Sequence, residues 1–324
     1  MEGFKEGVGA GVRAIVANRH LYERKSLSPN TQRTLQVTME SIFPRVEKQS
    51  PETYRLLTNL IYRANNYFDV GLPLQERMFC NNGPAAFVAL ETVYQGTRDA
   101  MLTAGEELKK FEPRARLVVE NFIGDGQRLF ASREEFSGVT YREIDSGIFA
   151  TLVLGVIGGG EYLRGLGIDP EKACATEDEL VNKYHLFQIG RMELDAVPAS
   201  PEVRRVIGMQ AIEMVLACLD DWLGQREDKL LGLPNSRENG DRGLIELISR
   251  YKAVARASGF SPLLVDTAAA FFSVFYEIKV KLKTRRKNGE PIGLSEIQRH
   301  RNVGSIHLLR EWLNYHGLLN EMVR

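Results

Sequence analysis

Two stretches of the sequence place oxygen-bearing side chains at helical spacing. In the first, Asn65, Asn66 and Asp69 share a face of a predicted helix with Tyr62, within an otherwise apolar segment. Two amides and a carboxylate among apolar neighbours are costly to bury unless they have partners. Hard divalent cations such as Mg²⁺ bind oxygen ligands of this kind. The segment therefore predicts either a metal-binding face or a polar seam hydrogen-bonded to a neighbouring helix.

The second stretch lies near the end of another predicted helix, about 150 residues further along the chain. Its carboxylates fall within an arc of roughly 120°, and they are Asp220, Asp221, Glu227 and Asp228. Like charges at this spacing repel one another unless water or cations screen them. The stretch therefore predicts either a second metal-binding face or a solvated helix end that Arg226 and Lys229 partly neutralise.

Helices must position these side chains, and their starts are marked in the sequence. A serine accepts from free amides of the first turn, and a proline that follows it loses no hydrogen bond. Such Ser-Pro pairs begin at Ser28, Ser50, Ser200 and Ser261. Capping-box spacing predicts two further starts, at Thr176 with Glu179 and at Ser132 with Glu135.

The apolar residues recur at helical rather than strand spacing. The segments with this pattern are 53–68, 84–102, 179–194, 203–223 and 263–280. The loops between them are short and carry turn residues, and no internal repeat is present. We therefore expect an all-α fold, a single thick bundle of about ten to twelve helices that forms one domain over residues 1–324.

One predicted helix, 148–166, contains a cluster of glycines. Gly155, Gly158, Gly159 and Gly160 fall within six positions of this apolar segment. Each glycine in a helix interior costs up to about 1 kcal/mol relative to alanine. The cluster therefore predicts either a break in the helix or a very close contact with a neighbouring helix.

The two acidic stretches together resemble the arrangement of class I isoprenoid synthases. Asn66-Tyr-Phe-Asp69 and the segment 219–229 are similar to two acidic elements of bacterial large-terpene cyclases of the tetraprenyl-β-curcumene synthase type. Asn66 and Gly224 stand where that family has acids. The resemblance implies an all-α barrel in which Mg²⁺ binds an isoprenyl diphosphate, and a terpene synthase or cyclase activity that proceeds by ionisation of the diphosphate and cyclisation of the carbocation.

The resemblance also implies roles for individual residues. The implied metal ligands are Asp69, Asn65, Asn66, Asp220, Asp221 and Asp228, and the implied catalytic residues are Asp69, Asp220, Asp221, Glu227 and Asp228. Aromatic faces would stabilise a carbocation by up to about 2 kcal/mol per desolvated contact. The aromatic candidates for this lining are Tyr62, Phe87, Tyr94, Phe149 and Phe272. Arg164 would contact the diphosphate, Gln225 would bind the substrate, and Arg285 with Arg286 could close over the diphosphate.

Other interpretations of the sequence stay open. The segment 187–195 resembles the second aspartate motif of chain-elongating prenyl diphosphate synthases, with Arg191 and Met192 in place of its paired aspartates. A protein of the same fold could also bind a prenyl chain without ionising it, because Asn66 and Gly224 replace acids. A different class is a helical interaction or RNA-binding protein, in which the basic run 279–287 makes the contacts.

Composition limits the choice of partners and compartment. Lys plus Arg number 42 and Asp plus Glu number 42, so the net charge is zero, which argues against a dedicated nucleic-acid binder. Three widely spaced cysteines indicate neither a disulfide framework nor a zinc site. The longest uncharged apolar stretch, 147–160, is shorter than the roughly 20 residues of a membrane span. We expect a cytoplasmic protein without a membrane span, and the sequence leaves a homodimer open.

Overall fold

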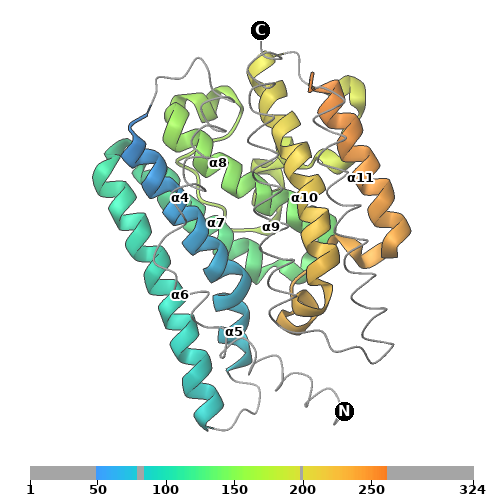
Figure 1. The fold of residues 1–324 in the computed structure, drawn as a ribbon. Coiled ribbons are helices and arrows are strands. Elements are labelled where there is room, and N and C mark those ends of the chain that lie inside the picture. Colours follow the sequence, from blue (N-terminus) through green and yellow to red (C-terminus); the bar gives the residue numbers. More distant parts are fainter. Residues whose placement is uncertain (1–48, 79–83, 198–199, 261–324) are drawn as a thin grey trace. The chain divides into compact units, whose positions relative to one another are not determined.

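The computed structural model describes residues 49–78, 84–197 and 200–260 (Figure 1). These residues form helices and turns and contain no β-strand, so the all-α prediction is confirmed for the described part of the chain. The chain divides into two compact units. Of the described residues, the first unit contains 49–78, 84–188 and 224–238, and the second contains the rest. The expected single domain over residues 1–324 stays a prediction.

The first unit holds most of the described helices. Its elements are α4 (Pro51–Asn66), the π-helical turn η1 (Tyr67–Gly71), α5 (Leu72–Arg77), α6 (Pro84–Phe111), the 3-10 turn η2 (Pro113–Ala115), α7 (Arg116–Ala131), the 3-10 turn η3 (Arg133–Glu135), α8 (Gly138–Gly165), α9 (Glu177–Lys183) and the 3-10 turn η4 (His185–Phe187). In this unit α4 lies along α6, and α7 lies along α8 (Figure 1). The contact side of α4 buries Leu57 and Leu60 completely, and each buried leucine contributes about 1.5–3 kcal/mol.

The second unit is smaller in its described part. It contains the 3-10 turns η5 (Ile189–Arg191) and η6 (Leu194–Ala196), the helix α11 (Gly240–Ala257) and α10 (Pro201–Leu231) as far as residue 223. The last turns of α10 belong to the first unit, and the 3-10 turn η7 (Ser236–Asn239) connects α10 to α11. α11 packs against η5 and η6.

The predicted helix starts are confirmed where their chemistry is local. Ser50 caps α4, because its side chain accepts from Thr53 N at 3.1 Å, and Pro51 is the first helical residue. α10 begins at Pro201, after Ser200. Thr176 caps α9 by accepting from Glu179 N at 3.2 Å. The predicted starts at Ser28 and Ser261 lie outside the described residues.

Two expectations about helices were wrong. Ser132 does not cap a long helix, because its hydroxyl donates to Glu177 Oε1 at 2.7 Å, and only the short turn η3 follows it. α8 begins instead after Ser137, whose side chain accepts from Thr140 N at 3.2 Å. The expected helix 179–194 ends early, because α9 stops at Lys183 and 3-10 turns follow. The segment 263–280 lies outside the described residues.

The glycine cluster in α8 produces both of the predicted effects. Gly159 has φ 81° and ψ 169°, a non-helical conformation that breaks the helix. Gly155 packs so closely on α7 that an added Cβ would lie 2.6 Å from Val118 Cγ1. Two residues before the break, the carbonyl of Ile157 accepts from Gln49 Nε2 at 3.1 Å. Gln49 therefore supplies a side-chain partner next to the interrupted helix.

α8 is also the one described helix that is long and apolar enough to cross a membrane by length and composition. Its most apolar window is 56% buried inside the protein, which is typical of a core helix as well.

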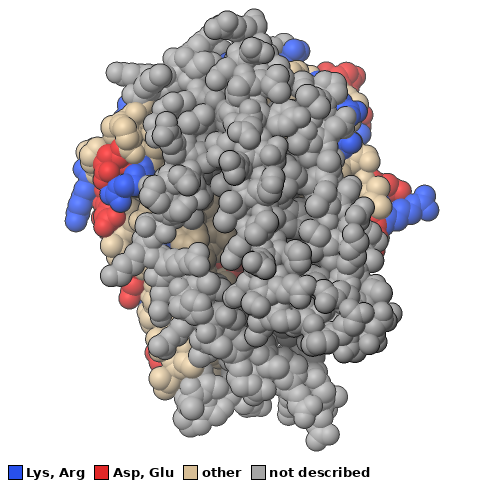
Figure 2. Space-filling view, viewed as in Figure 1, with Lys and Arg blue, Asp and Glu red and all other residues tan. Residues whose placement is uncertain are grey.

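The described charged side chains on the face in Figure 2 carry both signs and are interspersed. Exposed ion pairs such as Arg55 with Glu52 and Arg242 with Glu246 follow the helical spacing of these side chains.

Candidate functional site

The first acidic motif lies where the backbone changes from α-helix to π-helix. Asn65 is exposed in the last turn of α4, Asn66 is its half-buried final residue, and Asp69 lies half-buried within η1. π-helical turns are rare and occur frequently at functional sites. The wider turn also changes the angle between Asn66 and Asp69 that an uninterrupted α-helix would give. Asn66 Nδ2 is buried and has no hydrogen-bond partner among the described residues.

Aromatic packing fixes this π-helical turn in place. Tyr67 and Phe68 are both buried. The Phe68 ring lies 5.8 Å from the Phe122 ring on α7 and 6.4 Å from the Phe149 ring on α8. At the end of the turn, Gly71 packs directly on the Thr97 side chain of α6. The backbone that carries Asp69 is therefore held on three sides by other helices of the first unit.

A second carboxylate, which the sequence analysis did not identify, lies near this turn. Burial raises the pKa of Tyr141 on α8 well above its ordinary value, and the carboxylates of Asp145 and Asp69 raise that pKa further. Both carboxylates are therefore near enough to the Tyr141 hydroxyl for their charges to act on it. Asp145 is half-buried one helical turn before Phe149, whose ring contacts Phe68 beside Asp69. The packing of η1 on α8 thus brings Asp69 and Asp145 to the same region.

The second acidic motif is divided between the two units. Asp228, in the first unit, is buried, accepts from Asn235 Nδ2 at 2.6 Å and lies 3.6 Å from Arg142 Nη2. This carboxylate therefore has protein partners of its own. Glu227 also lies on the part of α10 in the first unit, whereas Asp220 and Asp221 lie on the part in the second, where Asp221 is buried.

The residues expected to contact substrate have varied surroundings. Gln225 Oε1 accepts from Arg237 Nη1 at 2.7 Å. Arg164 is exposed and forms a 3.2 Å ion pair with Glu171 rather than lying in a cavity. The segment 187–195 forms 3-10 turns in which Phe187 is buried and Arg191 is exposed.

The aromatic candidates belong to packed clusters or half-buried positions. The Tyr94 ring lies 6.1 Å from the Tyr67 ring, and the Phe149 ring lies 5.2 Å from the Phe122 ring. Tyr62 is half-buried and has the Arg63 guanidinium 5.7 Å from its ring centroid. Phe87 is half-buried on α6. Phe272, Arg285 and Arg286 lie outside the described residues.

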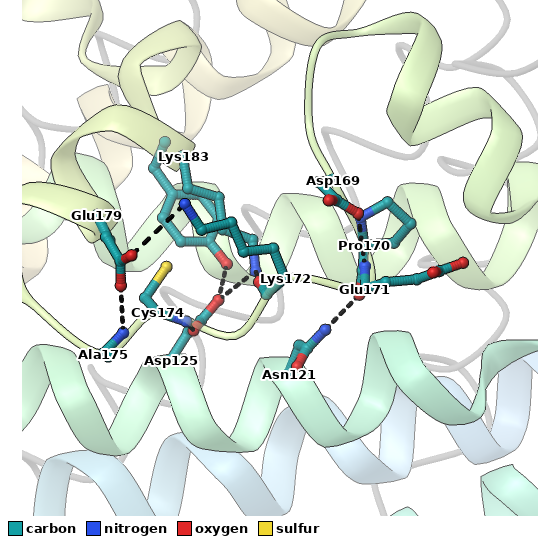
Figure 3. A network of polar contacts seen from close by, with 11 residues as sticks. Asn121, Asp125, Asp169, Pro170, Glu171, Lys172, Cys174, Ala175, Glu179 and Lys183 are labelled. Atoms are coloured by element: carbon teal, nitrogen blue, oxygen red, sulfur yellow. Dashed lines mark hydrogen bonds and ion pairs between the residues drawn. The ribbon is translucent and has the colours of Figure 1, made fainter.

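A second polar cluster, also not identified from the sequence, surrounds Asp125 on α7. This carboxylate is completely buried and accepts from Lys183 Nζ at 2.7 Å, from the Tyr184 hydroxyl at 2.6 Å and from Cys174 N at 3.0 Å (Figure 3). Lys183 Nζ also donates to the carbonyl of Lys172 at 2.7 Å. The cluster fixes the segment that leads into α9 against α7.

The donor set at the π-helical turn suits Mg²⁺. Among the described residues, no group of three or more His, Cys, Asp or Glu side chains could hold a metal ion. Mg²⁺, however, is usually bound by one or two carboxylates and keeps its other positions for water and phosphate oxygens. Asp69 and Asp145 supply two carboxylates, and the partly buried Asn66 amide lies three residues before Asp69.

Comparisons of the chain with protein-family models, with curated proteins and with solved structures gave no match in any of the three. The functional argument therefore rests on the residues of the site.

Proposed function

We propose that the protein is an isoprenoid-synthase-like helical bundle that binds an isoprenyl diphosphate through Mg²⁺ and ionises it, as a class I terpene synthase or cyclase does. The observation that carries the proposal is the position of Asp69 on a π-helical turn that packs on α8 through Phe68 and Phe149, one helical turn after Asp145. Carboxylate oxygens are the ligands that Mg²⁺ prefers, and a bound cation favours the charged form of carboxylates near it.

Each part of the proposed site has a chemical role. Asp69, Asp145 and the side-chain amide oxygen of Asn66 would hold the metal, and all three residues lie in the first unit. Mg²⁺ bound by these residues would stabilise the negative charge that develops on the leaving diphosphate. Arg142, which pairs with Asp228, lies close enough to Tyr141 to lower its pKa. Its planar guanidinium matches phosphate oxygens and would orient the diphosphate.

Ionisation breaks the bond between the allylic carbon and the diphosphate oxygen, and the electron pair leaves with the diphosphate. The carbocation then cyclises and either loses a proton or adds water. The faces of half-buried aromatic residues, among them Tyr62 and Phe149, would stabilise the positive charge. Close packing of Phe68, Phe122 and Phe149 excludes water from this side of the turn.

A member of the same fold that binds prenyl diphosphate without ionising it is the second candidate. Asn66 in place of an acid and the pairing of Asp228 with Arg142 favour it, because both reduce the negative charge available to a metal. The two candidates share a ligand and differ in whether diphosphate is released.

The test incubates the full chain with Mg²⁺ and prenyl diphosphates of several chain lengths. Release of inorganic diphosphate and formation of hydrocarbon or alcohol products are measured, and Mg²⁺-dependent binding is followed by calorimetry. We expect Asp69→Asn to lower the rate by more than about 100-fold. Asp99→Asn, an exposed aspartate on α6, is the matched control and should change nothing.

Binding that depends on Mg²⁺, without diphosphate release at any chain length, would establish the second candidate. If no prenyl diphosphate of any chain length binds or gives a product, both candidate functions are refuted.

A further inference from the structure

A small cavity lies inside the first unit, between α7, α8 and the segment that leads into α9. It has room for about one water molecule. Its polar lining consists of Asn121, Thr151, Lys183 and Tyr184, and the rest of its wall is apolar. None of the roles proposed above uses this cavity.

Thr151 is the residue that points to a ligand. The residue is 6% exposed, it lines the cavity, and its hydroxyl has no hydrogen-bond partner among the described residues. A buried hydroxyl that makes no hydrogen bond is destabilising, and most such groups in proteins are paired with protein atoms or ordered water.

The neighbouring residues have donors and acceptors to spare. The Lys183 ammonium has three N–H groups, of which two donate to Asp125 and to the carbonyl of Lys172 (Figure 3). The Tyr184 hydroxyl donates its proton to Asp125, so its oxygen can still accept. One donor and one acceptor of this cluster are therefore still available, and both belong to residues that line the cavity.

Charge and size decide which ligand fits. The carboxylate of Asp125, 2.7 Å from Lys183 Nζ, offsets the ammonium charge, so the cavity attracts neither an anion nor a cation strongly. The volume excludes anything much larger than water.

We propose that this cavity binds one structural water molecule. The water accepts from Lys183 Nζ, donates to the Tyr184 hydroxyl oxygen and pairs with Thr151 Oγ1. Three hydrogen bonds are typical of a buried water. The water joins α8, ahead of its break at Gly159, to the Asp125 cluster on α7 and α9.

The test compares two threonine-to-valine variants. Thr58 on α4 is completely buried, and its hydroxyl also has no partner in the described structure, but it does not line the cavity. Thr58→Val removes an unsatisfied hydroxyl and should leave the Tm unchanged or raise it. Thr151→Val removes a partner of the water and should lower the Tm by about 2–4 °C.

A direct measurement completes the test. Magnetic relaxation dispersion of water nuclei counts the long-lived internal waters, and we expect Thr151→Val to lose one relative to the wild type and to Thr58→Val. If Thr151→Val raises the Tm as Thr58→Val does and leaves the relaxation unchanged, the cavity is dry and the proposal is wrong.

Discussion

Asp125 illustrates how one buried side chain can hold a segment in place. Three donors surround its carboxylate, one of them an ammonium whose side chain is only 6% exposed. Removing one partner from such a pair costs about 3–5 kcal/mol, because the other charge stays buried. The exposed pair of Arg242 and Glu246 is worth roughly 0.3–0.5 kcal/mol. Burial and the number of donors, rather than the presence of an ion pair, thus distinguish the two sites.

Burial and the nearby Asp125 carboxylate together lower the reactivity of the Cys174 thiol. Burial, followed by the nearby Asp125 charge, raises the pKa of the Cys174 thiol from 9.0 to about 12. Three pKa units lower the thiolate fraction by about 1000-fold at neutral to mildly alkaline pH. We expect iodoacetamide to alkylate Cys174 in the folded protein at pH 8 at least about 1000-fold more slowly than in the unfolded chain. Peptide mass spectrometry measures both rates, and similar rates in the two states would contradict the pKa.

The raised pKa of Cys174 also determines the direction in which the stability of the fold changes with pH. The neutral thiol is favoured in the folded state. Its contribution to the free energy of unfolding is therefore fully present below pH 9.0 and is lost as the pH rises towards about 12. Cys174→Ala should therefore lose less stability over this alkaline range than the wild type. Urea unfolding at a series of pH values measures the difference.

For single residues, the sequence revealed those polar side chains that differ from their immediate neighbours along the chain. Asn66 and Asp69 were found because they interrupt an apolar stretch. Asp125 and Asp145 were missed, because what distinguishes them is distant along the chain: Lys183 lies 58 residues from Asp125. No local pattern encodes such a partner.

For helices and turns too, the sequence predicted the features that depend on nearby residues and missed those that depend on residues distant along the chain. The caps of α4 and α9 were predictable, because Ser50 and Thr176 bind amides only three residues away. The cap expected at Ser132 failed, because its hydroxyl donates to Glu177, 45 residues along the chain. The π-helical form of η1 was not predictable either, since it depends on the packing of Phe68 against α7 and α8.

The break in α8 gives a prediction at the scale of the element. Gly159 has φ 81° and ψ 169°, a region that only glycine occupies readily. Gly159→Ala should destabilise the protein by about 1–3 kcal/mol, although an added Cβ would meet nothing within 4 Å. The cause is therefore backbone conformation and not a clash.

Gly124→Ala is the matched control for Gly159→Ala. Gly124 lies within α7 and also has nothing within 4 Å of an added Cβ. Because its backbone is helical, alanine should stabilise the protein by up to about 1 kcal/mol. Chemical unfolding measures both variants, and a loss of stability in both, or in neither, would refute the assignment of the break to Gly159.

At the scale of the whole molecule, the all-α class was predicted correctly for the residues that the structure describes, because helical periodicity recurs in several separate segments of the sequence. The prediction that the two acidic motifs face one another depends instead on the arrangement of long segments, which periodicity does not specify. Asp228 reaches the first unit, while Asp220 and Asp221, less than three turns earlier on α10, belong to the second. Short spacing in a helix does not guarantee a shared environment.

Net charge gives the prediction that separates the enzyme from the nucleic-acid-binding alternative. With 42 basic and 42 acidic residues, the chain has no overall charge with which to release counterions from a polyanion. Non-specific binders usually reach dissociation constants of about 10⁻⁴–10⁻⁶ M at physiological salt. We expect the full chain to bind single-stranded RNA more weakly than about 10⁻⁴ M, as measured by fluorescence anisotropy.

The basic run 279–287 is the part of the sequence that could reverse this result. The double substitution Arg285→Gln and Arg286→Gln should leave the weak RNA signal unchanged if the run only forms a solvated basic segment. RNA binding could instead be tighter than this, fall steeply with salt and be abolished in the double variant. That result would show that the segment 279–287 binds RNA phosphates. The neutral composition would then conceal a local charge asymmetry, and the RNA-binding alternative would displace the proposed synthase.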